Sequence, residues 1–99
     1  MRIYKHRATV TTASGTVGSA SLNISGGLYH QLLIRANVAT TLFRADITDE
    51  NSIIIRNYGY HSGEINDIGF FLPLAGVTTI NITNASPNDT FTVLLSVAE

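Results

Sequence analysis

The sequence predicts an all-β protein, an antiparallel β-sandwich of about seven or eight short strands with a jelly-roll or immunoglobulin-like arrangement. Three observations support this fold class. Apolar residues recur at every second position through most of the chain, as they do in half-buried strands. Gly, Asn, Asp and Pro interrupt these runs at short intervals. No window carries the i, i+3, i+4, i+7 apolar spacing of an amphipathic helix, so we expect no significant helix.

The 99 residues are enough for one domain with one core. We expect a basic N-terminal arm over residues 1–7 and a single sandwich domain over residues 8–99. The arm holds half of the Lys and Arg residues, namely Arg2, Lys5 and Arg7. Such an arm either reaches a neighbouring molecule or stays solvated.

The first strands are expected in the Ser-, Thr- and Gly-rich third of the chain, around Val10 and around Leu22. The next run, residues 28–36, alternates clearly. Leu28, Leu32, Ile34 and Ala36 share the face expected to point into the core. The opposite, outward face then carries Tyr29, Gln31, Leu33 and Arg35.

A hairpin follows, because Phe43, Ala45 and Ile47 alternate with polar residues before a turn at residues 49–51. Its second strand covers residues 52–58, with Ile53 and Ile55 on one face and Ile54 on the other. Residues 59–66 contain two glycines, a His and a Glu, and predict a loop.

The last strands are also marked by alternation. Ile68, Phe70, Leu72 and Leu74 share one face and Phe71 lies on the other, while Pro73 favours a sheet edge or a strand end. Ile80 and Ile82 mark the next strand, and residues 84–89 form a turn. The clearest strand ends the chain, with Phe91, Val93, Leu95 and Val97 on one face.

Composition narrows the range of functions. A net charge of −1 argues against a general nucleic-acid or anionic-membrane binder. Disulfide scaffolds, thiolate zinc sites and cysteine nucleophiles are excluded because the sequence contains no Cys. No apolar run approaches the length of a membrane span, and the N-terminus lacks an apolar signal core.

The sequence predicts no enzyme and no cofactor. His61 and Glu64 are too few for a metal or acid–base site without a third group. The acidic segment 46–51 contains oxygen ligands that calcium accepts, but a hairpin turn requires the same residue types and is the preferred interpretation. His30 is expected in the core or in an interface.

Low charge content favours a protein partner. Charged residues make up only 13% of the chain, and interface centres are depleted in charge. Tyr29, Leu33, Ile54 and Phe71 are expected on outward faces of their strands, where another subunit or a larger host would cover them. The alternative is that they are scattered surface hydrophobes of the ordinary kind.

The overall pattern resembles the small all-β virion proteins of tailed bacteriophages, in particular capsid cement or decoration proteins. The resemblance covers most of the chain and rests on features spread along it. These are the Thr-, Ser- and Gly-rich opening of residues 9–27, the hairpin of residues 41–58, the LPLAG step at residues 72–76 with TTINI at 78–82, and the closing FTVLLSV at 91–97.

This resemblance implies a non-enzymatic protein on the outside of a phage capsid, commonly a homotrimer, that clamps neighbouring major capsid proteins together. Related phage proteins serve as head–tail or tail components. We expect a location in the virion, assembled in the host cytoplasm, with no membrane and no specific nucleic acid as partner. The residues predicted to contact the partner are Arg2, Lys5, Arg7, Tyr29, Leu33, Ile54, Tyr58, Tyr60 and Phe71. The alternative is a carbohydrate-binding β-sandwich module, in which Tyr58, Tyr60 and His61 stack on a sugar.

Overall fold

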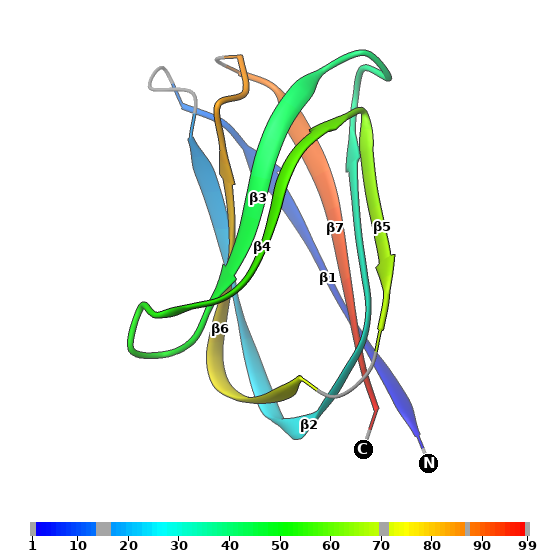
Figure 1. The fold of residues 1–99 in the computed structure, drawn as a ribbon, viewed down its shortest axis with the longest axis vertical. Helices are drawn as coiled ribbons and strands as arrows, with labels where there is room; N and C mark the ends of the chain where they lie inside the picture. Colours follow the sequence, from blue (N-terminus) through cyan, green and yellow to red (C-terminus); the bar gives the residue numbers. More distant parts are fainter. Residues whose placement is uncertain (1, 14–16, 70–71, 87, 99) are drawn as a thin grey trace.

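The computed structural model describes residues 2–13, 17–69, 72–86 and 88–98. These residues form seven strands and no helix, which confirms the all-β prediction (Figure 1). No helix in the described part of the chain is long and apolar enough to cross a membrane. The strands are β1 (Ile3–Thr11), β2 (Gly18–Ala36), β3 (Leu42–Thr48), β4 (Ile54–Ser62), β5 (Glu64–Ile68), β6 (Pro73–Thr83) and β7 (Thr90–Ala98).

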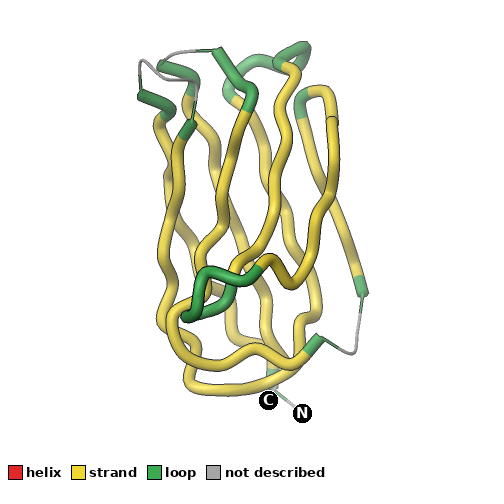
Figure 2. The backbone as a smooth tube through the Cα atoms, turned by 60° about the vertical axis from the view of Figure 1, so that its left-hand side comes forward, coloured by secondary structure: helices red, strands yellow, loops and turns green. Residues whose placement is uncertain are grey.

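All the strands pair antiparallel in one continuous sheet with the order β1-β7-β2-β6-β3-β4, and β5 pairs with β2. Strand β2 is 19 residues long and serves both layers of the sandwich (Figures 1 and 2). Its first half pairs with β6, while residues 28–36 pair with β7 on one edge and residues 31–35 with β5 on the other. Layer A therefore consists of β1, β7, the second half of β2 and β5. Layer B consists of the first half of β2 with β6, β3 and β4.

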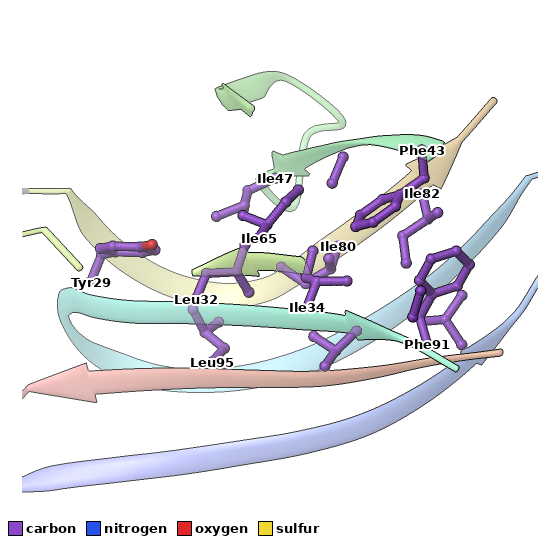
Figure 3. Close-up of a cluster of buried hydrophobic side chains, with 14 of the residues drawn as sticks. Tyr29, Leu32, Ile34, Phe43, Ile47, Ile65, Ile80, Ile82, Phe91 and Leu95 are labelled. Carbon is purple, nitrogen blue, oxygen red and sulfur yellow. The ribbon is translucent and has the colours of Figure 1, made fainter. Parts of the chain in front are cut away.

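The core lies between the two layers, where the inward residues of both interdigitate (Figure 3). The faces predicted from alternation are confirmed for three strands, because their inward residues are all buried. These are Phe43, Ala45 and Ile47 of β3, Ile80 and Ile82 of β6, and Phe91, Val93, Leu95 and Val97 of β7. The rings of Phe43 and Phe91 meet at 4.9 Å between centroids, so they join the two layers.

The predicted faces of Leu28 and Tyr29 are wrong. Leu28 is 44% exposed, whereas Tyr29 is buried in the core. The register of β2 against β7 shifts between Tyr29 and Gln31, which leaves His30 as an extra residue. Such a bulge moves every residue on one side of it to the other face. Alternation counted through His30 therefore assigned the wrong face to the residues that precede it.

The predicted loop over residues 59–66 is also wrong. Strand β4 runs to Ser62, Gly63 makes the turn, and β5 begins at Glu64. Gly63 has a φ of 76°, its N–H donates to the Thr41 carbonyl at 2.7 Å, and its carbonyl accepts from the Ala36 N–H at 2.8 Å. Gly63 thus joins the turn between β4 and β5 to the end of β2 and to the β2–β3 connection.

Several boundaries differ from the prediction. Two of the three basic residues expected in an N-terminal arm, Lys5 and Arg7, lie within β1, because residues 3–11 pair with the whole of β7, whereas Arg2 precedes the strand. Ile68 pairs with Gln31 and shares its outward face, so Ile68 is exposed rather than buried. Ile53 lies in the connection before β4 and is also exposed rather than buried. Pro73 is the first residue of β6, as its missing N–H predicted. Phe70 and Phe71 lie outside the described residues.

Gly63→Ala should destabilise the fold. A Cβ at this position would overlap the Ala39 carbonyl, and the positive φ adds strain. We expect the free energy of unfolding to fall by about 3 kcal/mol, measured by urea denaturation. Gly59→Ala is the matched control, because Gly59 has a φ of 68° with open space around its Cβ position. It should lose only about 1 kcal/mol, and equal losses in both variants would contradict this explanation.

Candidate interaction surfaces

The outer face of layer A gathers basic and apolar side chains from four strands. Residues that pair across antiparallel strands share a face, so the register defines its rows. The first row is Lys5, Ser96, Gln31 and Ile68, although Ser96 itself is buried. The second row is Arg7, Leu94, Leu33 and Asn66. We call this surface the basic face.

The basic face has an apolar centre and a positively charged edge. Leu33 and Leu94 are half-buried at the centre, and Ile68 is 62% exposed at one side. Lys5 and Arg7 are exposed on β1, and no carboxylate among the described residues forms an ion pair with either. An apolar centre with uncompensated charge at the rim is typical of a protein-binding surface.

Three of the residues predicted to contact a partner therefore lie on one face: Lys5, Arg7 and Leu33. Arg2 lies at the start of the chain, where its guanidinium donates to the Tyr4 hydroxyl at 3.2 Å. Sequence reasoning missed Leu94 and Ile68, because only the strand order and register make them neighbours of Leu33.

Strands β4 and β5 meet at Gly63, yet each pairs with a different neighbour, β4 with β3 and β5 with β2. Side chains join the two strands across the resulting seam. The Arg56 guanidinium donates to the Asp67 carboxylate at 2.9 Å. The Tyr58 hydroxyl donates to the Tyr29 hydroxyl at 3.1 Å, and Tyr29 donates to Asp67. We call these four side chains the seam network.

Arg56 also lies over the two tyrosine rings of the seam network. Its guanidinium lies 5.4 Å from the ring centroid of Tyr58 and 5.9 Å from that of Tyr29. Burial, the hydrogen bond with Tyr58 and the charge of Asp67 raise the pKa of Tyr29 far above its usual value. Burial likewise raises the pKa of Tyr58 to about 12. Both tyrosines were predicted to contact a partner, but Tyr29 is buried in the core and Tyr58 is half-buried against it.

A group of polar side chains occupies part of the outer face of layer B, which also carries the exposed apolar residues Leu42 and Ile54. The Asn81 side-chain amide donates to the Asp46 carboxylate at 2.8 Å and to the Thr48 hydroxyl at 3.2 Å. Tyr60 is 60% exposed beside this group, with the Arg44 guanidinium 5.1 Å from its ring centroid. Tyr60 is the one predicted aromatic contact in the described residues whose ring is open to solvent. We call Arg44, Asp46, Thr48, Tyr60 and Asn81 the polar face.

The connection between β3 and β4 is the predicted hairpin turn. The Asp49 carboxylate accepts from the backbone N–H groups of Asn51 and Ile53, at 2.9 and 3.0 Å. This carboxylate therefore stabilises the turn. Ile54, a predicted contact residue, begins β4 and is 54% exposed.

The candidate chemical groups are not assembled into one site. His61 Nε2 lies 2.9 Å from the Tyr58 carbonyl, whereas Glu64 forms an ion pair with Arg35 at 2.8 Å. His30 occupies the bulge of β2 and is half-buried. Among the described residues, no three His, Asp or Glu side chains are grouped so that they could hold a metal ion.

No protein-family model and no curated protein matches the chain. A solved structure of a family two carbohydrate esterase from Cellvibrio japonicus is similar over 95% of this chain, with 11% sequence identity and a TM-score of 0.34. This chain covers 34% of the esterase chain. A similarity this distant decides neither fold nor function.

The seam network makes stability sensitive to alkaline pH. Tyr58 ionises near pH 10 in the unfolded chain and near pH 12 in the fold, so the folded state holds its proton more tightly. The stabilisation is complete below about pH 10 and is lost as the pH rises through about 12. We expect urea midpoints to fall over this range. In Tyr58→Phe the pH slope should be shallower by about one proton, and an unchanged slope would refute the coupling.

Proposed function

We propose that the chain is a non-enzymatic structural subunit of a phage virion, attached to the outside of the capsid. In this role it binds the major capsid protein and stabilises contacts between capsid subunits, as the resemblance in sequence pattern implies. The basic face of layer A is the surface that the assembly buries, and the subunit acts as a homo-oligomer, with a trimer favoured.

The observation that carries this proposal is the basic face itself. It places Leu33 and Leu94 at the centre of an open sheet face, with the cationic groups of Lys5 and Arg7 beside them. Burying apolar area supplies binding free energy, and exposed charges that meet opposite charges accelerate association and fix orientation. The complementary partner surface is therefore acidic with an apolar centre.

A clamp of this kind requires buried interface area rather than a catalytic group. A shell under internal pressure ruptures where contacts between neighbouring subunits separate. A bound subunit that spans such a contact adds interface that must be broken at the same time, so the free energy needed for rupture rises with the buried area. A rigid sandwich suits the role, because little of its binding free energy is spent on ordering flexible segments.

Arg7→Glu should weaken attachment by about tenfold, because it reverses one charge at the rim of the basic face. The measurement is co-sedimentation of purified chain with capsids of the phage or prophage that carries the gene. Arg44→Glu is the matched control, since it makes the same charge change on the outer face of layer B. The proposal fails if the unaltered chain stays in the supernatant, or if both variants bind equally.

A second candidate function is saccharide binding by the polar face. The observation that favours it is the exposed ring of Tyr60 beside the hydrogen-bonding groups of Asp46 and Asn81. An aromatic ring stacks on the apolar face of a sugar, while planar carboxylate and amide groups bind its hydroxyls. Arg44 holds the ring in place from one side.

Tyr60→Ala tests this second function. If the polar face binds saccharides, the unaltered chain should give hits on a glycan array, and Tyr60→Ala should lower their affinity by about tenfold. Leu42→Ala is the control, because Leu42 is an exposed apolar residue on the neighbouring strand β3. An array without hits for the unaltered chain would remove saccharide binding from consideration.

A further inference from the structure

The tip of the β3–β4 hairpin, residues 49–54, exposes two adjacent isoleucines. Ile53 is 59% exposed and Ile54 is 54% exposed. Neighbouring residues of an extended chain point in opposite directions, so a tip that lay on the sandwich would bury one of them. Both remain open because this connection projects from the side of the sandwich (Figures 1 and 2). We call residues 49–54 the hairpin tip.

The hairpin tip is also acidic. It contains Asp49 and Glu50, and it has no basic residue. A cavity of about 210 Å³ lies between the tip and the start of β6, with both of these residues and the apolar side chains of Ile55 and Leu74 in its lining. The tip therefore combines exposed apolar groups with negative charge and a hollow beside them.

These properties complement those of the basic face, which combines Leu33 and Leu94 with the cationic groups of Lys5 and Arg7. The hairpin tip extends from layer B, whereas the basic face is the outer surface of layer A. One copy cannot bring its own tip onto its own basic face, but the tip of one copy can reach the basic face of a second copy.

We infer that a second copy of this chain covers the basic face with its hairpin tip. Ile53 and Ile54 of one copy pack on Leu33 and Leu94 of the next, and the acidic groups of the tip face the cations of β1. This inference rests on the proposed function and assigns the basic face to the contact between copies within the homo-oligomer, so that Arg7→Glu weakens capsid attachment by breaking the oligomer that attaches through several copies at once. The contact joins two different patches, so it is head-to-tail, and repeating it closes a ring or extends a filament.

Two variants, each with one patch altered, test this geometry. The face variant carries Lys5→Glu and Arg7→Glu, and the tip variant carries Ile53→Ser and Ile54→Ser. Both pairs of residues are exposed, so we expect each variant to keep the thermal unfolding midpoint of the unaltered chain. Mass is measured by light scattering after size exclusion. The unaltered chain should form an oligomer larger than the 10.7 kDa monomer, and each variant alone should be monomeric.

The decisive sample is an equal mixture of the two variants. The face variant retains an unaltered hairpin tip, and the tip variant retains an unaltered basic face. Only the contact between these two patches can form in the mixture. We expect a dimer with twice the monomer mass and nothing larger. Leu42→Ser, an exposed apolar change away from the tip, should leave the oligomer intact. If the tip variant fails to fold, Glu50→Lys replaces it.

Three results would overturn the inference. They are a monomeric unaltered chain at all concentrations, a mixture that stays monomeric, and a face variant that still self-associates, which would indicate contact between two tips. The proposed function fails separately. A chain that stays monomeric but co-sediments with capsids keeps its function and loses this contact, whereas a chain that forms the mixed dimer but ignores capsids keeps the contact alone.

Discussion

The structure depends on strand β2, which hydrogen-bonds to three other strands. Its first half holds β6 in layer B, and its second half holds β7 and β5 in layer A. The two layers are therefore one covalent and hydrogen-bonded unit that encloses a single core. The positions of the basic face and the polar face follow from the path of β2, because each face lies on the outer surface of a layer to which β2 contributes a strand.

Where alternation was unbroken, the residues alone identified the core. Phe43, Ala45 and Ile47 on β3 and the inward residues of β7 were assigned correctly, since each strand keeps a strict period of two. The error at Tyr29 has a specific cause, a bulge at His30 that no propensity marks. Gly63 was similarly hidden, because a one-residue turn between two polar strand ends has the composition of a loop.

The candidate surfaces were predictable only in part. Lys5, Arg7 and Leu33 were named from charge and alternation, but their common face depends on β7 lying between β1 and β2. Long-range strand order is not encoded in any local pattern. Tyr58 shows a second limit of sequence reasoning. It was predicted to contact a partner because it is amphipathic and precedes a segment with the composition of a loop, but its side chain packs in the seam between β4 and β5. A tyrosine that binds a partner and one that closes a fold have the same local sequence signature.

The pairing of β1 with β7 has a mechanical consequence. Ile3 pairs with Ala98, so the two ends of the fold lie side by side (Figure 1). The ladder bonds of an antiparallel pair run across the strands, so tension on the two ends would load them one pair at a time. The domain would peel from its ends at low force. Tension applied along the strands from opposite ends of the sandwich would instead be shared by several rows of bonds, so the direction of an external load decides how firmly the sandwich resists it.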